Sequence, residues 1–123
     1  MCLLRDPSVK IKGNKVWKIL TRDFESIMYP YKWKPGWNEA ILQEEKSEIF
    51  VHSGFHVYLN RKDTIGYGLV IEFTFDMADL IATGVHDSNT SVKQAVFKRL
   101  HLSEEIWKEN YLTGKAGMGI MNT

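Results

Sequence analysis

Residues 69–75 alternate between two sets of side chains, and this pattern constrains the fold more than any other stretch of the sequence. One set is strongly apolar and the other is mixed: Leu69, Ile71, Phe73 and Phe75 against Val70, Glu72 and Thr74. Successive side chains of a strand point to opposite faces. The alternation therefore predicts a strand with one face toward the core.

Further strands are predicted at Val16–Leu20, Gly54–Leu59 and Gln94–Leu102. Pro30 and the Pro35-Gly36 pair favour an edge strand or a loop between the first two. The polar stretch Val85–Ser91 is expected to be a loop.

Two helix starts are expected. Asn60 is predicted to cap a short helix that Gly66 and Gly68 end, and Ser103 to cap another that presents Trp107 to the core. Strands with few helices indicate an α+β domain with a central, mostly antiparallel or mixed sheet and short flanking helices.

The 123 residues suffice for one domain, not two. We expect this domain to span residues 1–112 and to be followed by a flexible, glycine-rich tail over residues 113–123.

The charge and the cysteine content exclude several classes of function. The net charge of +1 argues against nucleic-acid binding, which needs a basic surface to neutralise phosphates. A single cysteine, Cys2, leaves no intrachain disulfide and no cysteine-based zinc motif. No apolar run is long enough to cross a bilayer. We therefore expect a cytoplasmic protein without a membrane segment, metal or cofactor.

Cys2 is the first candidate catalytic residue. Removal of Met1 would give Cys2 a free α-amino group, which can serve as the base for its thiol. The alternative is that Cys2 is simply part of a flexible terminus.

His56 is the second candidate. It falls on the opposite strand face from Phe55 and Val57, and Gly54 before it permits close backbone approach. A neutral imidazole there is suited to act as a general base or to orient a ligand. The alternative is a histidine that hydrogen-bonds a neighbour. His52 lies four residues away, a spacing that a strand does not bring together for zinc.

The third candidate is an aromatic cluster that provides rings for stacking on a ligand. Its members, with Tyr58 from the following strand, are Tyr29, Tyr31, Trp33 and Trp37. The alternative is a lid of aromatic side chains over one end of the sheet.

Four short blocks occur in order along the chain: Met1-Cys2-Leu3, residues 15–20, residues 31–36 and residues 54–58, which contain Gly-Phe-His. This pattern resembles a family of small proteins that includes the fish differentially regulated trout protein and bacterial and phage relatives. The resemblance spans about residues 1–102. It draws attention to Cys2 and His56 and hints at host–microbe conflict or stress, but it implies no reaction.

A second likeness is to a reduced ADP-ribosyltransferase core. Those enzymes carry a Ser-Thr-Ser segment and a late catalytic glutamate. Here the comparable strand begins at Gln94 and no such segment precedes it. This likeness implies at most a degenerate fold that binds a nucleotide-like ligand.

Two hypotheses of different kinds follow. The first is a protein that binds a small ligand or a partner between the aromatic cluster and the His56 and Tyr58 face. The second is an enzyme in which Cys2 attacks a small electrophile with help from His56.

Overall fold

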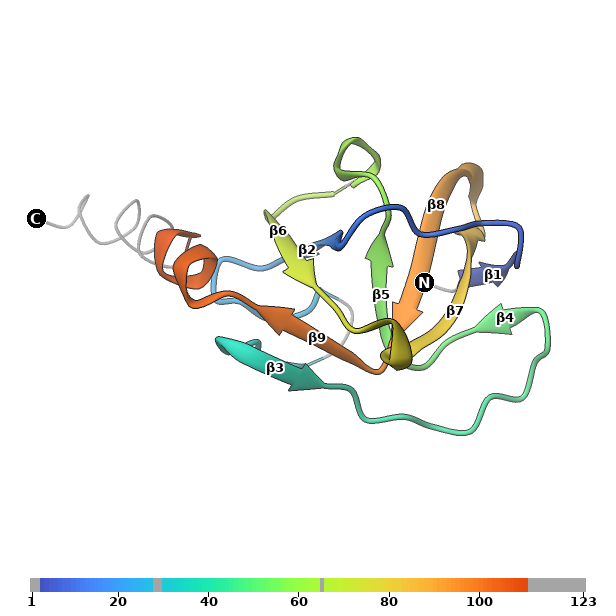
Figure 1. The fold of residues 1–123 in the computed structure, drawn as a ribbon, viewed down its shortest axis with the longest axis horizontal. Coiled ribbons are helices and arrows are strands. Elements are labelled where there is room, and N and C mark those ends of the chain that lie inside the picture. The colour runs from blue at the N-terminus through green and yellow to red at the C-terminus, as the bar shows by residue number, and fades with distance from the viewer. Residues whose placement is uncertain (1–2, 28–29, 65, 111–123) are drawn as a thin grey trace, which may run out of the picture.

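The computed structural model describes residues 3–27, 30–64 and 66–110, and within them nine strands form one antiparallel sheet (Figure 1). The order across the sheet is β3-β9-β6-β2-β5-β8-β7-β1-β4. The strands are β1 (Leu3–Arg5), β2 (Lys15–Leu20), β3 (Gly36–Glu39), β4 (Phe50–Val51), β5 (Phe55–Tyr58), β6 (Leu69–Thr74), β7 (Leu80–His86), β8 (Asn89–Phe97) and β9 (Arg99–Leu102). The predicted tail over residues 113–123 lies outside the described residues.

The prediction of an α+β domain is wrong, because the described residues are nearly all-β. Their helical content is one α-helical stretch at residues 104–110 and two 3-10 turns, η1 (Arg61–Asp63) and η2 (Met77–Asp79). Ser103 does cap the α-helix, since its Oγ accepts the backbone N–H of Ile106 at 3.0 Å.

The expected helix after Asn60 is only the single turn η1, and Asn60 does not cap it. Its side chain accepts no cap hydrogen bond and instead donates to Asp63 Oδ2 at 3.2 Å. A capping residue marks where a helix can begin, but the few residues before Gly66 offer no apolar face to extend it.

The predicted strands at Val16–Leu20, Gly54–Leu59 and residues 69–75 match β2, β5 and β6 to within one residue at each end. The single strand predicted over Gln94–Leu102 is wrong, because the chain breaks at Lys98 between β8 and β9.

The expected loop at Val85–Ser91 is also wrong. β7 continues to His86 and β8 begins at Asn89, so the connection is the two-residue turn Asp87-Ser88. The polar residues that suggested a loop are the exposed start of β8. They lie where the hairpin projects beyond the core, so burial did not require apolar side chains there.

Both faces of the central strands are covered. The main core lies on one face and includes Val16, Leu20, Phe73 and Phe97 among its fully buried members. A smaller cluster of Leu3, Val51, Ala82 and Val96 covers the other face. All four residues of β5 are consequently buried. This double coverage explains why β5 lacks the polar face that its sequence pattern suggested.

β2 and β5 pair at a single position, and the gap beside this pair is where the candidate site lies. Trp17 is opposite Tyr58, whereas β2 pairs with β6 along its whole length. The two strands therefore diverge on either side of Trp17, and backbone groups in the gap need other hydrogen-bond partners. The connection over residues 40–49 links β3 at one edge of the sheet to β4 at the other (Figure 1).

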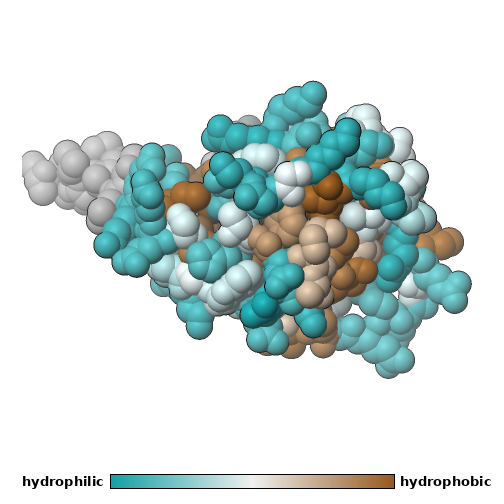
Figure 2. Space-filling model, viewed as in Figure 1, coloured by the Kyte–Doolittle hydropathy of each residue, from teal (hydrophilic) through white to brown (hydrophobic). Residues whose placement is uncertain are grey.

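The surface is mixed in polarity. Figure 2 shows apolar side chains gathered near the centre of one face, ringed by polar ones, with a further apolar group at the right-hand end. Among the described residues, no helix is both long and apolar enough to cross a membrane.

Candidate functional site

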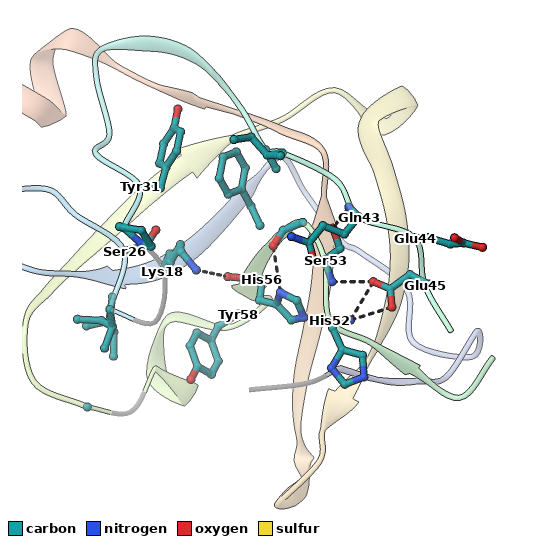
Figure 3. A pocket seen from close by; sticks show the side chains of 18 of the residues that line it. Lys18, Ser26, Tyr31, Gln43, Glu44, Glu45, His52, Ser53, His56 and Tyr58 are labelled. Atoms are coloured by element: carbon teal, nitrogen blue, oxygen red, sulfur yellow. Dashed lines mark hydrogen bonds between the residues drawn. The ribbon is translucent and has the colours of Figure 1, made fainter. Parts of the chain in front are cut away.

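A cavity of about 710 Å³ opens where β2 and β5 diverge (Figure 3). Its walls come from β2, β5, residues 26–27 and 30–31, the 40–46 part of the long connection, residues 52–54 and the rim at Gly66 and Tyr67. The cavity is lined by two consecutive residues of β5, Phe55 and His56, whose side chains point to opposite faces of the sheet. This is the size and the mixed lining expected of a small-molecule site.

Lys18 is the central polar group of the cavity. By strand alternation it shares a face with Val16 and Leu20, which are fully buried in the main core. Its Nζ donates to the backbone carbonyl of His56 at 2.9 Å (Figure 3). The lysine thus supplies a hydrogen bond to a carbonyl of β5, because the backbone of β2 diverges there and does not pair with it.

The environment of Lys18 disfavours its charged form. Burial removes water from the ammonium and lowers its pKa from 10.5 to about 8. Among the described residues, no carboxylate lies within 4.0 Å of Lys18 Nζ to counter this effect. The cavity therefore contains a half-buried amine that, within the part of the chain that the structure describes, donates only to an uncharged carbonyl.

His56 is held between two backbone carbonyls. Its Nε2 lies 2.9 Å from the oxygen of Val51, and its Nδ1 lies 3.2 Å from the oxygen of Gly54. Burial lowers its pKa, and the charge of Lys18 adds to this, although the two carbonyl contacts oppose it. A neutral ring donates from one nitrogen only. The geometry fits a ring oriented by the shorter contact, with Nε2 donating to Val51.

Glu45 holds together the wall of the cavity formed by residues 43–45 and 52–53. Its carboxylate accepts the backbone N–H of Ser53 at 2.6 Å and that of His52 at 3.0 Å (Figure 3). The hydroxyl of Ser53 in turn accepts the N–H of Gln43 at 2.8 Å. These bonds fasten the long connection to the residues before β5, while Glu44 points away from Lys18 and His56. The wall is therefore held by a carboxylate that is already engaged.

Gly54 lies between these two parts of the site and is essential to its geometry. Its φ is +106°, and a Cβ placed there would lie 2.5 Å from Val96 Cγ1. Only glycine fits comfortably in this conformation at this close approach. The close backbone approach expected before His56 is therefore present.

The predicted site residues are divided among three places. Tyr31, Tyr58 and His56 line the cavity. Trp33 is 2% exposed and packs in the core against Phe55, with ring centroids 4.3 Å apart. Trp37 is 45% exposed on the edge strand β3, where the Arg99 guanidinium lies 4.4 Å from its ring centroid.

Tyr31 links the core and the cavity. Its ring packs edge-on against Trp33 at 4.9 Å, and its hydroxyl donates to Asn38 Oδ1 at 2.9 Å. The aromatic cluster is thus not a single stacking surface in the part of the chain that the structure describes. Cys2 and Tyr29 lie outside the described residues.

Sequence reasoning missed Lys18 and Glu45. A signal for Lys18 was available, because it occupies a core-facing position between Val16 and Leu20 in a predicted strand. A charged residue at such a position requires a polar neighbour or an opening in the core. Glu45 had no comparable signal, since it lies in a connection without periodicity.

Within the three described segments, no group of three or more His, Cys, Asp or Glu side chains is placed to hold a metal ion. The chain matches no family model, no curated protein and no solved structure. The two family resemblances of the sequence therefore stay predictions.

Proposed function

We propose that this protein binds a small, largely apolar molecule that carries an anionic group, and that Lys18 is the polar anchor for that group. The observation that carries the proposal is the position of Lys18 in the cavity, half-buried and without a carboxylate within 4.0 Å among the described residues.

The energetics of the cavity lining support an anionic ligand. A desolvated ammonium is destabilised until a counter-charge approaches, and a charge-assisted hydrogen bond is stronger than one between neutral groups. The cavity offers apolar surface from Ile19, Phe55 and Tyr58 for the rest of the ligand. Burial of that surface supplies most of the binding free energy, and Lys18 fixes the orientation.

The proposed ligand also agrees with the charges on the wall. Glu45 already accepts two backbone N–H groups, and Glu44 points away from the site. Lys46 adds a second cation to the lining. An anionic group beside Lys18 therefore meets its ammonium, which has no described carboxylate within 4.0 Å.

The test uses 4-phenylbutyrate as a probe, because it joins an apolar ring and chain to one carboxylate. Binding is followed by backbone amide NMR shifts, with the amides of Gly54 and Gly66 as reporters from two sides of the cavity. The expected result is saturable shifts at these amides. Substitution Lys18→Met weakens the affinity about tenfold or more, since a charge-assisted hydrogen bond contributes about 1.5–3 kcal/mol.

Lys15→Met is the matched control. Lys15 is on the same strand but is exposed and pairs with Glu72 at 3.6 Å, outside the cavity lining. The uncharged analogue 4-phenyl-1-butanol separates apolar binding from charge recognition, and its affinity is expected not to fall in Lys18→Met. Shifts that map away from Gly54 and Gly66, or equal affinities in both lysine variants, contradict the proposed function.

A further inference from the structure

The arrangement that favours an anion also prepares Lys18 for covalent chemistry. Its amine borders an open cavity. Toward the described residues it makes one hydrogen bond, to a backbone carbonyl, and none of their carboxylates lies within 4.0 Å to hold it as a salt bridge. We propose that Lys18 is a carbonyl-reactive amine, whose Nζ condenses reversibly with a small aldehyde or ketone in the cavity to form an imine. The inference uses the same cavity as the proposed function but requires no anionic group on the ligand.

An amine must be neutral to attack a carbonyl carbon. Burial lowers the pKa of Lys18 to about 8, which leaves about a tenth of the amine neutral at pH 7. An exposed lysine with a pKa near 10.4 has a neutral fraction that is smaller by a factor of a few hundred. Lys18 is therefore the better nucleophile at neutral pH, although its position is less exposed.

The reaction balances without any oxidant or reductant. The Nζ lone pair forms a bond to the carbonyl carbon, and the C=O π pair moves to oxygen, which takes up a proton as the nitrogen loses one. The resulting carbinolamine takes a proton from solvent onto its hydroxyl and expels water, while the nitrogen lone pair forms the C=N bond of a protonated imine. The neutral imine forms when this nitrogen returns a proton to solvent. The sum is one amine and one carbonyl compound giving one imine and one water.

The same contacts suit the product. A protonated imine retains one N–H, and the His56 carbonyl that now accepts from Nζ at 2.9 Å is placed to accept it. The apolar side chains Ile19, Phe55 and Tyr58 limit the water near the C=N bond, which slows hydrolysis. The cavity can thus both admit a carbonyl compound to Lys18 and stabilise the imine that forms.

Several other titratable groups line the cavity with Lys18. Among them, His56 is linked to Lys18 by the hydrogen bond from Nζ to its backbone carbonyl, and the charge of Lys18 helps to lower the pKa of the His56 imidazole. The described titratable groups in the lining are Tyr31, Glu44, Glu45, Lys46, His52, His56, Tyr58 and Tyr67. Glu45 is engaged with backbone N–H groups, so it does not stabilise the ammonium by direct pairing.

The experiment treats the full chain with benzaldehyde at pH 7 and traps any imine with cyanoborohydride. Peptide mapping by mass spectrometry then gives the rate of benzylation at each lysine. Lys18 is expected to react at least tenfold faster than Lys15, which is exposed on the same strand. The preference is expected to shrink to about twofold or less near pH 10.5, where about half of an ordinary lysine is also neutral.

Three controls separate the effect of a lowered amine pKa from the effect of binding in the cavity. The α-amino group of the expressed chain is an internal reference, because ordinary α-amines have pKa values of about 7.7–8.0. Saturating 4-phenylbutyrate is expected to protect Lys18 and to leave the α-amine rate unchanged. In Lys18→Arg, which keeps a cation at the site, the cavity adduct is expected to be lost.

The failures of the two proposals are distinguishable. Equal rates at Lys18 and Lys15 overturn the imine proposal, whatever the affinity for 4-phenylbutyrate. Preferential reaction of Lys18 without any binding of 4-phenylbutyrate supports the imine and overturns the anion-binding function instead. Benzylation of Lys18 that 4-phenylbutyrate fails to block, although that probe binds, places the reaction outside the cavity and also overturns the imine proposal.

Discussion

β2 contributes to two contrasting regions of the molecule, the apolar main core and the partly polar cavity. Val16 and Leu20 enter the main core, where they are fully buried among other apolar side chains. Lys18, between them on the same face, borders a cavity of about 710 Å³ and bonds a carbonyl of β5. The comparison shows that one strand can follow the apolar alternation of a core and break it where the sheet opens.

The largest expected effect contrasts the filled core with the rim of the cavity. Phe73 is 1% exposed in the main core, whereas Tyr67 at the rim is 98% exposed. Phe73→Ala is expected to lower the free energy of unfolding by about 3–5 kcal/mol, because it removes buried surface and leaves a void. Tyr67→Ala is expected to change it by less than about 0.5 kcal/mol. Urea unfolding measures both, and similar losses would erase the distinction between the two regions.

The second expected effect concerns the pH dependence of stability at the cavity. Folding lowers the pKa of Lys18 from 10.5 to about 8, so the unfolded chain binds this proton more tightly between those pH values. The free energy of unfolding of the wild type therefore rises relative to Lys18→Met as pH increases from 8 to 10.5. The relative gain is up to about 3 kcal/mol at 1.36 kcal/mol per pKa unit.

Urea unfolding of the two proteins at pH 7, 8, 9 and 10.5 measures this difference. Lys15→Met is the control, because that exposed side chain pairs with Glu72 outside the cavity. A constant difference between the wild type and Lys18→Met across the series would show that Lys18 is no less solvated than Lys15.

A smaller effect is expected at the glycine that joins the two regions. Gly54→Ala forces a side chain into a backbone with φ of +106° and against Val96, and we expect a loss of about 2–3 kcal/mol. Gly13→Ala is the matched control, since Gly13 also has a positive φ of +82° but has nothing within 4 Å of the added Cβ. Its expected loss is about 1 kcal/mol. Thermal unfolding compares the two, and equal losses would mean that the close packing beside His56 contributes nothing.

The strands of the core were predictable from sequence because each alternates over enough residues. β6 follows its predicted apolar face through Ile71 and Phe73, which are both buried. The helices were overestimated, since capping residues such as Asn60 also begin single 3-10 turns. The β7–β8 hairpin was missed because its outer residues, such as Asn89, are exposed and polar.

The site was predictable only in part, because the cavity is formed by segments that are far apart in the sequence. His56, Tyr31 and Tyr58 were singled out by residue type and strand position, and they do line the cavity. The role of Lys18 depends on the divergence of β2 from β5, which no local pattern encodes. Trp33 shows the converse, because an aromatic residue chosen as a ligand contact is packed in the core.

The most direct test of the account is the titration of Lys18 itself, followed by NMR of its ¹³Cε with and without 4-phenylbutyrate. We expect a midpoint near the pKa of about 8 that burial gives Lys18 in the free protein, and a rise in that pKa when the carboxylate binds. A midpoint at the ordinary 10.5 that the probe does not move would contradict the central claim that Lys18 is the desolvated anchor of a ligand site.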